Sequence, residues 1–348
     1  AIVNDGGNVG NAFKINAATG EIRVNDATAI DFETLNSYTL TISMTDPEGE
    51  VDTATVLIDV SDINEAPSVS LTNPTNTIAE NTDTTSAVKV ADIVITDDAL
   101  GTNTLSLAGA DAGAFEIVGT ELFLKAGSAL DYESQVTYDV SVQVDDAGVV
   151  GSPDGTATHP FAVTAVNEAP AFLNGNGSVT FVEDGPAVVL DIDIAIADPE
   201  LSAADNFDGA TLTLSRNGGA DAEDVFSASG TLSALTEGGN LVLGVTTIGT
   251  VTTNSAGTLV LTFNANATNV RVNQAMQQIA YSNTNNTPPA SVQINWTFND
   301  RNTGSQGSGS ELTASGFTTV SITPANDAPT VDAVVSTATE DDAGYTID

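Results

Sequence analysis

Apolar and polar residues alternate along most of the chain, in short runs. The clearest runs are residues 38–44, 56–60, 138–144, 190–196 and 292–298. A period of two, with one face of the strand exposed to solvent, is typical of antiparallel sheets. Clusters of Gly, Asn and Asp separate the runs at short spacing. The pattern therefore predicts an all-β chain of antiparallel β-sandwiches.

The run 190–196 also predicts which side chains are buried. Leu190, Ile192 and Ile194 alternate with Asp191 and Asp193. Because successive side chains of a strand point to opposite faces, we expect the three apolar residues inside and the two acids outside.

One segment departs from the period of two. Val272, Met276 and Ile279 lie at i, i+4 and i+7 within residues 269–280. This spacing favours a short amphipathic helix across an edge of its domain, where it serves as a connector that packs on the core.

A short phrase recurs at domain-sized intervals. It reads Asp-Ile-Asn-Glu-Ala-Pro at 62–67, Val-Asn-Glu-Ala-Pro at 166–170 and Ala-Asn-Asp-Ala-Pro at 325–329. Such repeats mark domain boundaries, and the proline stiffens each link. We expect the end of one domain, a complete domain, a domain enlarged by a hairpin near 241–260 and by the helix, and the start of another. Their bounds are 1–65, 66–169, 170–327 and 328–348.

The chain is strongly acidic. Seven basic residues stand against 47 acidic ones, so the net charge is −40. Such a chain repels phosphate backbones and anionic lipid, which excludes nucleic acid as a partner. The sequence contains no apolar run long enough to predict direct membrane insertion. The carboxylates must be solvated or neutralised, and Ca²⁺, a hard cation that prefers oxygen ligands, is the natural partner.

Residue types that carry most catalysis are scarce. There is no cysteine, and the one histidine, His159, precedes Pro160 in a strand-like run, where we expect a structural role. Trp296 alternates with apolar residues and is expected in a core. Paired carboxylates can hydrolyse glycosides, but here they recur at domain ends rather than in one cleft. We therefore predict that the chain is not an enzyme.

Acidic motifs accompany the recurring phrase. Asp-x-Glu occurs at Asp31 and Glu33 and again at Asp131 and Glu133. In an extended segment both acids of each motif would face one way. Further acids lie early in a strand, in pairs after a strand, or singly after late strands: Glu80, Glu183, Asp97, Asp98, Asp198, Glu200, Asp145 and Asp300.

Together these motifs resemble the cadherin repeat, which combines a first-strand Glu, an Asp-x-Glu motif, an Asp-x-Asn-Asp-Asn-Ala-Pro linker and a downstream Asp pair. Residues 13–67 are a close match and 68–170 a looser one. Residues 171–329 lack Asp-x-Glu and are more similar to the larger cadherin-like repeats of giant bacterial surface adhesins, including the repeats-in-toxin type. The Asn-Glu-Ala-Pro form of the linker is also closer to the bacterial versions.

The resemblance implies that each junction gathers calcium ligands from two domains and their linker. The first junction would use Asp31, Glu33, Asp62, Asn64, Glu65, Asp97, Asp98 and Asp145. The second would use Glu80, Asp131, Glu133, Asn167, Glu168, Asp198, Glu200 and Asp300, with Ala165 in place of the linker's first Asp. The third retains Glu183, Asn326 and Asp327. The linkers are one residue shorter than in animal cadherins, so three ions per junction are not implied.

These features predict a calcium-binding extracellular spacer or adhesion region, built as an extended array of tandem Ig- or cadherin-like sandwiches. Because ligands come from both sides of a junction, calcium would favour the aligned arrangement of neighbouring repeats of the same chain. We expect a cell-surface location and a longer parent protein. The alternative is a glycan- or protein-binding module in the third domain, formed by the hairpin around 244–257 and the loop 202–209.

Overall fold

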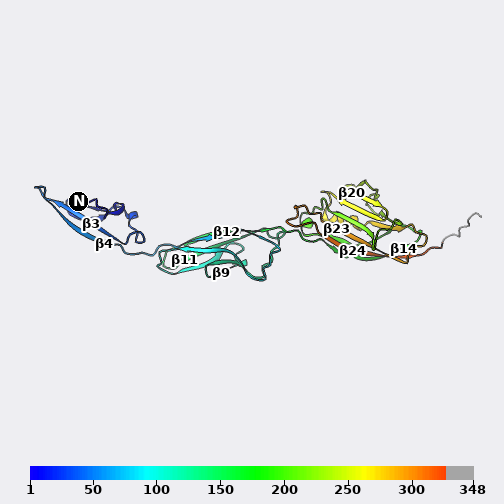
Figure 1. Cartoon of the computed structure of the whole chain (residues 1–348), viewed down its shortest axis with the longest axis horizontal. Coiled ribbons are helices and arrows are strands. Elements are labelled where there is room, and N and C mark those ends of the chain that lie inside the picture. The colour runs from blue at the N-terminus through cyan, green and yellow to red at the C-terminus, as the bar shows by residue number, and fades with distance from the viewer. Residues whose placement is uncertain (327–348) are drawn as a thin grey trace, which may run out of the picture. The chain divides into compact units, whose positions relative to one another are not determined.

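The computed structural model describes residues 1–326 (Figure 1). The chain divides into two compact units. The first contains residues 1–130 and 135–163, and the second contains residues 131–134 together with the chain from Thr164 onward. The expected start of a fourth domain, 328–348, lies outside the described residues.

The first unit opens with two small sheets. Its elements up to residue 65 are η1 (Val9–Asn11), β1 (Phe13–Ile15), β2 (Ile22–Val24), η2 (Ala27–Ala29), β3 (Ser37–Thr45) and β4 (Val51–Asp59). β1 pairs with β2, and β3 pairs with β4 along its whole length. Phe13, Tyr38 and Leu40 are buried together, and the Phe13 and Tyr38 rings meet edge to face with centroids 5.0 Å apart. This packing fixes the hairpin of β3 and β4 against β1.

A sandwich of two four-stranded sheets completes the first unit. One sheet has the order β5 (Ser68–Thr72), β7 (Val88–Thr96), β10 (Glu121–Leu124) and β9 (Phe115–Val118). The other has the order β6 (Thr77–Ala79), β12 (Gly155–Thr164), β11 (Thr137–Asp146) and β8 (Asn103–Ala108), with η3 at Ala112–Ala114. Phe115 of the first sheet meets Phe161 of the second edge to face, with ring centroids 5.6 Å apart. The core therefore lies between the two sheets.

The second unit is a larger sandwich. Seven strands form one sheet in the order β14 (Asn176–Val182), β24 (Thr313–Thr323), β23 (Ser291–Asn299), β17 (Thr211–Arg216), β21 (Thr258–Phe263), β20 (Thr246–Ser255) and β19 (Asn240–Leu243). Three strands form a second sheet, β15 (Val188–Val189), β22 (Ile279–Asn283) and β18 (Asp224–Ala228). β13 (Ala171–Leu173) pairs with β16 (Ala195–Ala197), and the helices are α1 (Pro199–Ala203) and α2 (Asn269–Met276).

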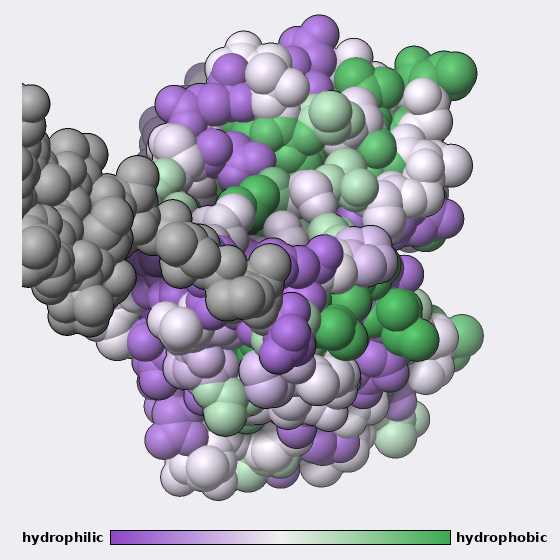
Figure 2. Space-filling view, turned by 90° about the vertical axis from the view of Figure 1, so that its right-hand side faces the viewer, coloured by the Kyte–Doolittle hydropathy of each residue, from purple (hydrophilic) through white to green (hydrophobic). Residues whose placement is uncertain are grey.

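The core of the second unit is closed by aromatic and aliphatic side chains. Trp296, Phe298 and Tyr281 are fully buried, and the Trp296 indole N–H donates to Thr318 Oγ1 at 3.0 Å. The face seen in Figure 2 is mostly hydrophilic or intermediate, and its hydrophobic residues form separate small patches. The buried indole of Trp296 needs a hydrogen-bond partner such as the Thr318 hydroxyl, because an unpaired polar group in the core costs free energy.

Most expectations about strands and core residues are confirmed. The all-β fold is present, and four of the five alternating runs lie in β3, β4, β11 and β23. The expected helix is α2, with Val272 and Met276 buried, and Ile279 instead opens β22. The expected hairpin is formed by β19 to β21. His159 is buried in β12 and its Nε2 lies 3.1 Å from the Thr75 carbonyl oxygen, which fits a structural role.

Three expectations are wrong or incomplete. Asp191 is buried and Ile192 is 78% exposed, the reverse of the expected pattern. The reason is a turn, because Asp191 Oδ1 accepts hydrogen bonds from the amides of Asp193 and Ile194 at 3.1 and 3.0 Å and ends the alternation. The Asp-x-Glu motifs also lie in turns rather than extended segments. Finally, β14 and β24 pair in parallel, within an otherwise antiparallel sheet.

A buried ion pair in the second unit generates a stability prediction. Arg216 donates from Nε and Nη2 to the two Asp224 oxygens at 2.8 and 2.6 Å, and the Asp224 side chain is fully buried. Asp224→Asn removes the buried negative charge beside Arg216 and leaves Asp221, whose Oδ2 lies 2.8 Å from Arg216 Nη1, as the other acidic partner. Asp224→Asn should therefore lower the free energy of unfolding by about 3 kcal/mol.

Urea unfolding followed by the fluorescence of Trp296, the chain's one tryptophan, measures this change. The matched control is Glu311→Gln, which breaks the exposed pair with Arg301 and should change stability by less than about 0.5 kcal/mol. Equal effects of the two substitutions would contradict the prediction.

Candidate metal centres at the domain linkers

Three carboxylates meet at the first linker. Glu33, Asp62 and Glu65 each place one oxygen within 4.8 Å of the others. A hollow of about 480 Å³ is lined by residues that include Asp31, Glu33, Glu65, Asp97 and Asp98. The structure thus brings together predicted ligands from the first domain, the linker and the following sandwich within one unit. Carboxylates this close repel one another unless a proton or a cation lies between them.

The Asp-x-Glu motif is held by its own aspartate. Asp31 accepts hydrogen bonds from the amides of Glu33 and Thr34 and from the Thr34 hydroxyl. Asp131 does the same for Ser134, whose amide and hydroxyl donate at 2.9 and 2.8 Å. Each aspartate therefore stabilises a turn that presents the following glutamate.

The acidic pair after β7 has two different roles. Asp98 accepts from the amides of Glu65 and Leu100, both at 2.7 Å, and so ties the linker to the loop. Asp97 Oδ2 accepts from Asn103 Nδ2 at 2.5 Å, whereas its Oδ1 is buried without a hydrogen-bond partner. The adjacent pair thus leaves Asp97, more than Asp98, with oxygen to offer a cation.

Asp146 was missed by the sequence reasoning, which chose Asp145. Asp145 Oδ1 is buried and unpartnered, as expected of a ligand. However, it is Asp146 that lies beside Asn64 of the linker, and hydrogen bonds from Gly148, Thr102 and Asn64 lower its pKa. Gly148 is close to both, since a Cβ built there would lie 2.5 Å from Asn64 Nδ2 and 3.3 Å from Asp146 Oδ1. The doubled aspartate at the end of the alternating run was the available signal.

The second linker has its own cluster in the second unit. Asn167 Nδ2 donates to Asp300 Oδ2 at 2.8 Å, and the Glu168 amide donates to Glu200 Oε1 at 2.7 Å. Asp198 caps α1 by accepting from the Leu201 amide at 2.9 Å. The linker is thus fastened to α1 and to the residue after β23, where the buried carboxylates of Asp198, Glu200 and Asp300 lie.

The same unit brings two more acids of the predicted second set together. Glu133 and Glu168 each place a carboxylate oxygen within 4.8 Å of the other. Asp131 lies two residues before Glu133, in the same turn of this unit. Glu80, also predicted for this set, is a buried residue of the first unit.

Electrostatics in these clusters favour a proton or a cation. Burial, followed by the charges of Glu200 and Asp300, raises the pKa of Asp198 to about 7. Partial desolvation, followed by the neighbouring acids Asp98 and Glu33, raises the pKa of Glu65, whose side chain is exposed. The ionised form of both groups is therefore disfavoured until positive charge is supplied.

Most of the buried oxygens that accept no hydrogen bond, Asp191 Oδ2 apart, belong to residues in or beside these clusters. Within residues 1–326 they include Asp62 Oδ1, Asn64 Oδ1, Asp97 Oδ1, Asn103 Oδ1, Asp145 Oδ1, Asp146 Oδ2, Asn167 Oδ1, Glu183 Oε1, Asp191 Oδ2, Asp198 Oδ2, Glu200 Oε2 and Gln306 Oε1. An unsatisfied buried polar atom costs about 1–3 kcal/mol, so a folded protein carries few of them. All are carboxylate or amide oxygens, the donor type that calcium takes.

Two amides in this set were not predicted from the sequence. Asn103 bonds Asp97, and Gln306 donates from Nε2 to the Asp300 carbonyl oxygen at 3.1 Å. Each then leaves its side-chain carbonyl oxygen buried and unpartnered. Nothing in their local sequence distinguishes them from other loop amides.

The third predicted set is represented by Glu183. Its Oε2 accepts from the Ala325 amide at 2.8 Å and its Oε1 is buried without a hydrogen-bond partner. Asn326 is the last described residue, and Asp327 lies outside the described residues.

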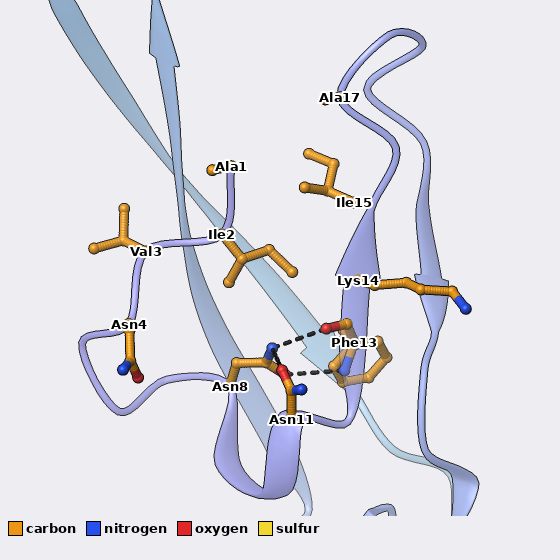
Figure 3. A pocket seen from close by; sticks show the side chains of 10 residues that line it. All are labelled: Ala1, Ile2, Val3, Asn4, Asn8, Asn11, Phe13, Lys14, Ile15 and Ala17. Atoms are coloured by element: carbon orange, nitrogen blue, oxygen red, sulfur yellow. Dashed lines mark hydrogen bonds between the residues drawn. The ribbon is translucent and has the colours of Figure 1, made fainter.

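Another hollow, near the start of the chain, has a different character. It measures about 640 Å³ and lies between residues 1–3 and β1 (Figure 3). Asn8 bridges its floor, since Asn8 Nδ2 donates to the Phe13 carbonyl oxygen at 2.8 Å and the Phe13 amide donates to Asn8 Oδ1 at 2.9 Å. Ile2, Val3 and Ile15 also line it. Its lining contains no carboxylate, so it has neither a metal-binding nor an acid–base set.

Comparisons with known proteins agree with the motifs. Over 191 residues the chain is 34% identical to Cadherin-1 of Gallus gallus, a match that covers 50% of this chain and 21% of that protein. Over 186 residues it is 34% identical to Protocadherin alpha-9 of Mus musculus, covering 50% of this chain and 18% of that protein. The repeats are cadherin-like. The chain thus spans about a fifth of the length of these relatives.

Comparisons with family models and with solved structures say less about this chain. No family model matches the chain. A solved structure of "Protocadherin Gamma B2 extracellular cadherin domains 1-5" aligns with a TM-score of 0.49 at 19% identity, covering 94% of this chain and 53% of that chain. The curated relatives are cadherins and protocadherins rather than enzymes, in agreement with the expectation of no catalytic activity. No helix among residues 1–326 is long and apolar enough to cross a membrane.

The raised pKa of Asp198 predicts how stability depends on pH without divalent cations. The pKa is about 7 in the folded state and about 3.9 in an unfolded chain. Between these values the folded state binds the extra proton, so the free energy of unfolding should fall as the pH rises from about 4 to about 7.

Chelator-treated protein can be unfolded in urea at several pH values, with Trp296 fluorescence as the signal. Asp198→Asn should reduce the decline with pH. The control, Asp208→Asn, changes an exposed acid of the same unit and should leave the decline intact. If Asp198→Asn does not alter the decline of the free energy of unfolding with pH, the decline comes from other titratable groups and the prediction is wrong.

Proposed function

We propose that this chain is a calcium-binding spacer or adhesion region, stiffened by Ca²⁺ at its domain linkers. The observation that carries the proposal is the gathering of buried, unpartnered carboxylate and amide oxygens in and around the linkers. The similarity to cadherins supports the same reading.

The donor set favours calcium over other cations. Every candidate ligand side chain is a carboxylate or an amide. Calcium accepts six to eight oxygens in flexible geometry, whereas Mg²⁺ needs a tighter octahedron and retains its water. With no cysteine in the chain, thiolate sites for softer metals are excluded.

Stiffening follows from where the ligands lie. Asp62, Asn64 and Glu65 belong to the linker, while Glu33 precedes it and Asp97 and Asp146 follow it. An ion held by all three groups lowers the free energy only of the arrangement that brings them together. Neighbouring repeats of the same chain are then the immediate partners, and calcium sets their alignment.

The location and the parent protein belong to the same proposal. Low-affinity calcium modules, with Kd of about 10⁻⁴–10⁻³ M, suit an exterior where calcium is plentiful, so we place the chain outside the cell, at a cell surface. The Asn-Glu-Ala-Pro linker and the enlarged third domain favour a large bacterial surface adhesin of the repeats-in-toxin type as the parent. The relatives named above are animal proteins, so this assignment rests on the linker form and the domain size.

Calcium should raise the melting temperature of the chain and narrow its range of shapes in solution. At a free calcium concentration one hundred times Kd, one site adds about 2.7 kcal/mol to stability. Calorimetry with calcium, with magnesium and with excess chelator measures the first effect, and small-angle X-ray scattering measures the second. The same melting temperature and the same range of shapes in calcium and in excess chelator would contradict the proposal.

Two substitutions localise the effect at the first linker. Asp62→Asn should weaken calcium binding and widen the distribution of shapes. Asp52→Asn removes an exposed acid of β4 and should change neither. Equal losses from both would mean that calcium acts on the net charge of the chain, not at a site.

A further inference from the structure

Charged residues avoid the seven-stranded sheet of the second unit. They make up 16% of the chain, so a sheet of this size would be expected to carry several. Its seven strands contain one, Arg216, and that side chain is only 17% exposed because it pairs with buried Asp224. In a protein with 47 acidic residues, the outer face of this sheet is electrically neutral.

Most side chains of the outer face carry a hydroxyl or an amide, and they lie in register across the strands. Thr213 lies opposite Thr297 on one side and Val260 on the other, and Ser215 lies opposite Asn295. Gln293 lies opposite Thr319, and Thr297 opposite Ser315. Such groups both donate and accept hydrogen bonds, and they lose less on desolvation than carboxylates do.

A hollow of about 270 Å³ lies on this face. Its lining includes Asn217, Gln293, Asn295, Thr297, Ser315 and Phe317. Phe317 is 38% exposed, which is unusual for a phenylalanine in this chain, where Phe115, Phe161 and Phe298 are at most 2% exposed. The hollow thus combines polar groups with one accessible aromatic ring.

The side-chain amides in the hollow form a relay, meaning two consecutive hydrogen bonds with an unpaired group at each end. Gln293 Nε2 donates to Asn295 Oδ1 at 2.9 Å, and Asn295 Nδ2 donates to Asn217 Oδ1 at 3.3 Å. Within the described part of the chain, Gln293 Oε1 and Asn217 Nδ2 have no protein partner. One end can accept a hydrogen bond and the other can donate one, so a ligand with hydroxyl groups satisfies both.

We propose that this hollow binds a neutral saccharide. Sugar hydroxyls match the open ends of the relay, and the C–H face of a sugar ring can pack on Phe317. The net charge of −40 repels anionic ligands, and a cationic ligand would prefer the acid-rich linkers to a face without carboxylates. Among residues of the seven strands, Val182 and Phe317 are the exposed large hydrophobics, too little apolar surface for a protein partner that binds through hydrophobic contacts.

This site differs from the one expected from the sequence. The hairpin around 244–257 comprises β20 and the turns that join it to β19 and β21, toward the far edge of the same sheet, whereas the hollow lies over β23 and β24. It uses none of the candidate calcium ligands. The saccharide proposal therefore stands or falls separately from the calcium proposal.

The test is binding of the whole chain to immobilised neutral oligosaccharides of glucose, mannose, galactose and N-acetylglucosamine, with sialylated and uronic-acid glycans on the same array. We expect saturable binding to at least one neutral series and none to the acidic glycans. Asn295→Asp, which adds one negative charge at nearly constant shape, should weaken that binding about tenfold or more, and Phe317→Ala should do the same.

The matched control is Thr250→Asp, which adds the same charge to the same face three strands away, level with Asn299 and so about 20 Å from Asn295, and should leave binding unchanged. A blank neutral array would overturn the proposal, as would saturable binding that Asn295→Asp and Phe317→Ala leave intact. Sedimentation supplies one more outcome. If the chain self-associates and Asn295→Asp abolishes the association without any glycan signal, the face is an interface between copies and the saccharide proposal is wrong.

Discussion

Repulsion among carboxylates at the linkers is the constraint on which this chain depends. Glu33, Asp62 and Glu65 converge within 4.8 Å, and Asp198 is fully buried near the charges of Glu200 and Asp300. A fold that buries like charges must supply a compensating positive charge or hold protons. Much of the surrounding structure, from the turn caps at Asp31 and Asp131 to the capped helix α1, holds these acids in place despite that repulsion.

The backbone hydrogen bonds of the linkers show how the acids are positioned. Asp98 and Glu200 each accept a hydrogen bond from the amide of a linker glutamate, Glu65 and Glu168 respectively. The two linkers therefore share one contact: an acid of the following domain accepts a hydrogen bond from the amide of the linker glutamate. The repetition of this contact at both sites reflects the repetition of the Asn-Glu-Ala-Pro phrase in the sequence.

Alternation and recurring motifs predicted most of the strands, the helix α2 and most of the acids in the clusters. They failed where a side chain redirects its own backbone. Asp191 looked like the outward residue of a strand, but its carboxylate bonds two following amides and buries itself, leaving Ile192 exposed. Asn103 and Gln306 could not be selected because a loop amide becomes a candidate ligand only through the tertiary fold. The choice between Asp145 and Asp146 depended on how β11 ends, which alternation does not specify.

The parallel pairing of β14 and β24 bears on how the enlarged domain responds to force. β14 lies near the start of this domain and β24 at its end, and seven residue pairs join them from Asn176 opposite Phe317 to Val182 opposite Thr323. A pull applied through the two ends of the domain would draw these strands past each other lengthwise. The ladder would then be loaded in shear, with its evenly spaced hydrogen bonds strained together rather than one after another. Resistance to forced unfolding is set by the rate of such a rupture, so the domain has the geometry of a mechanical clamp.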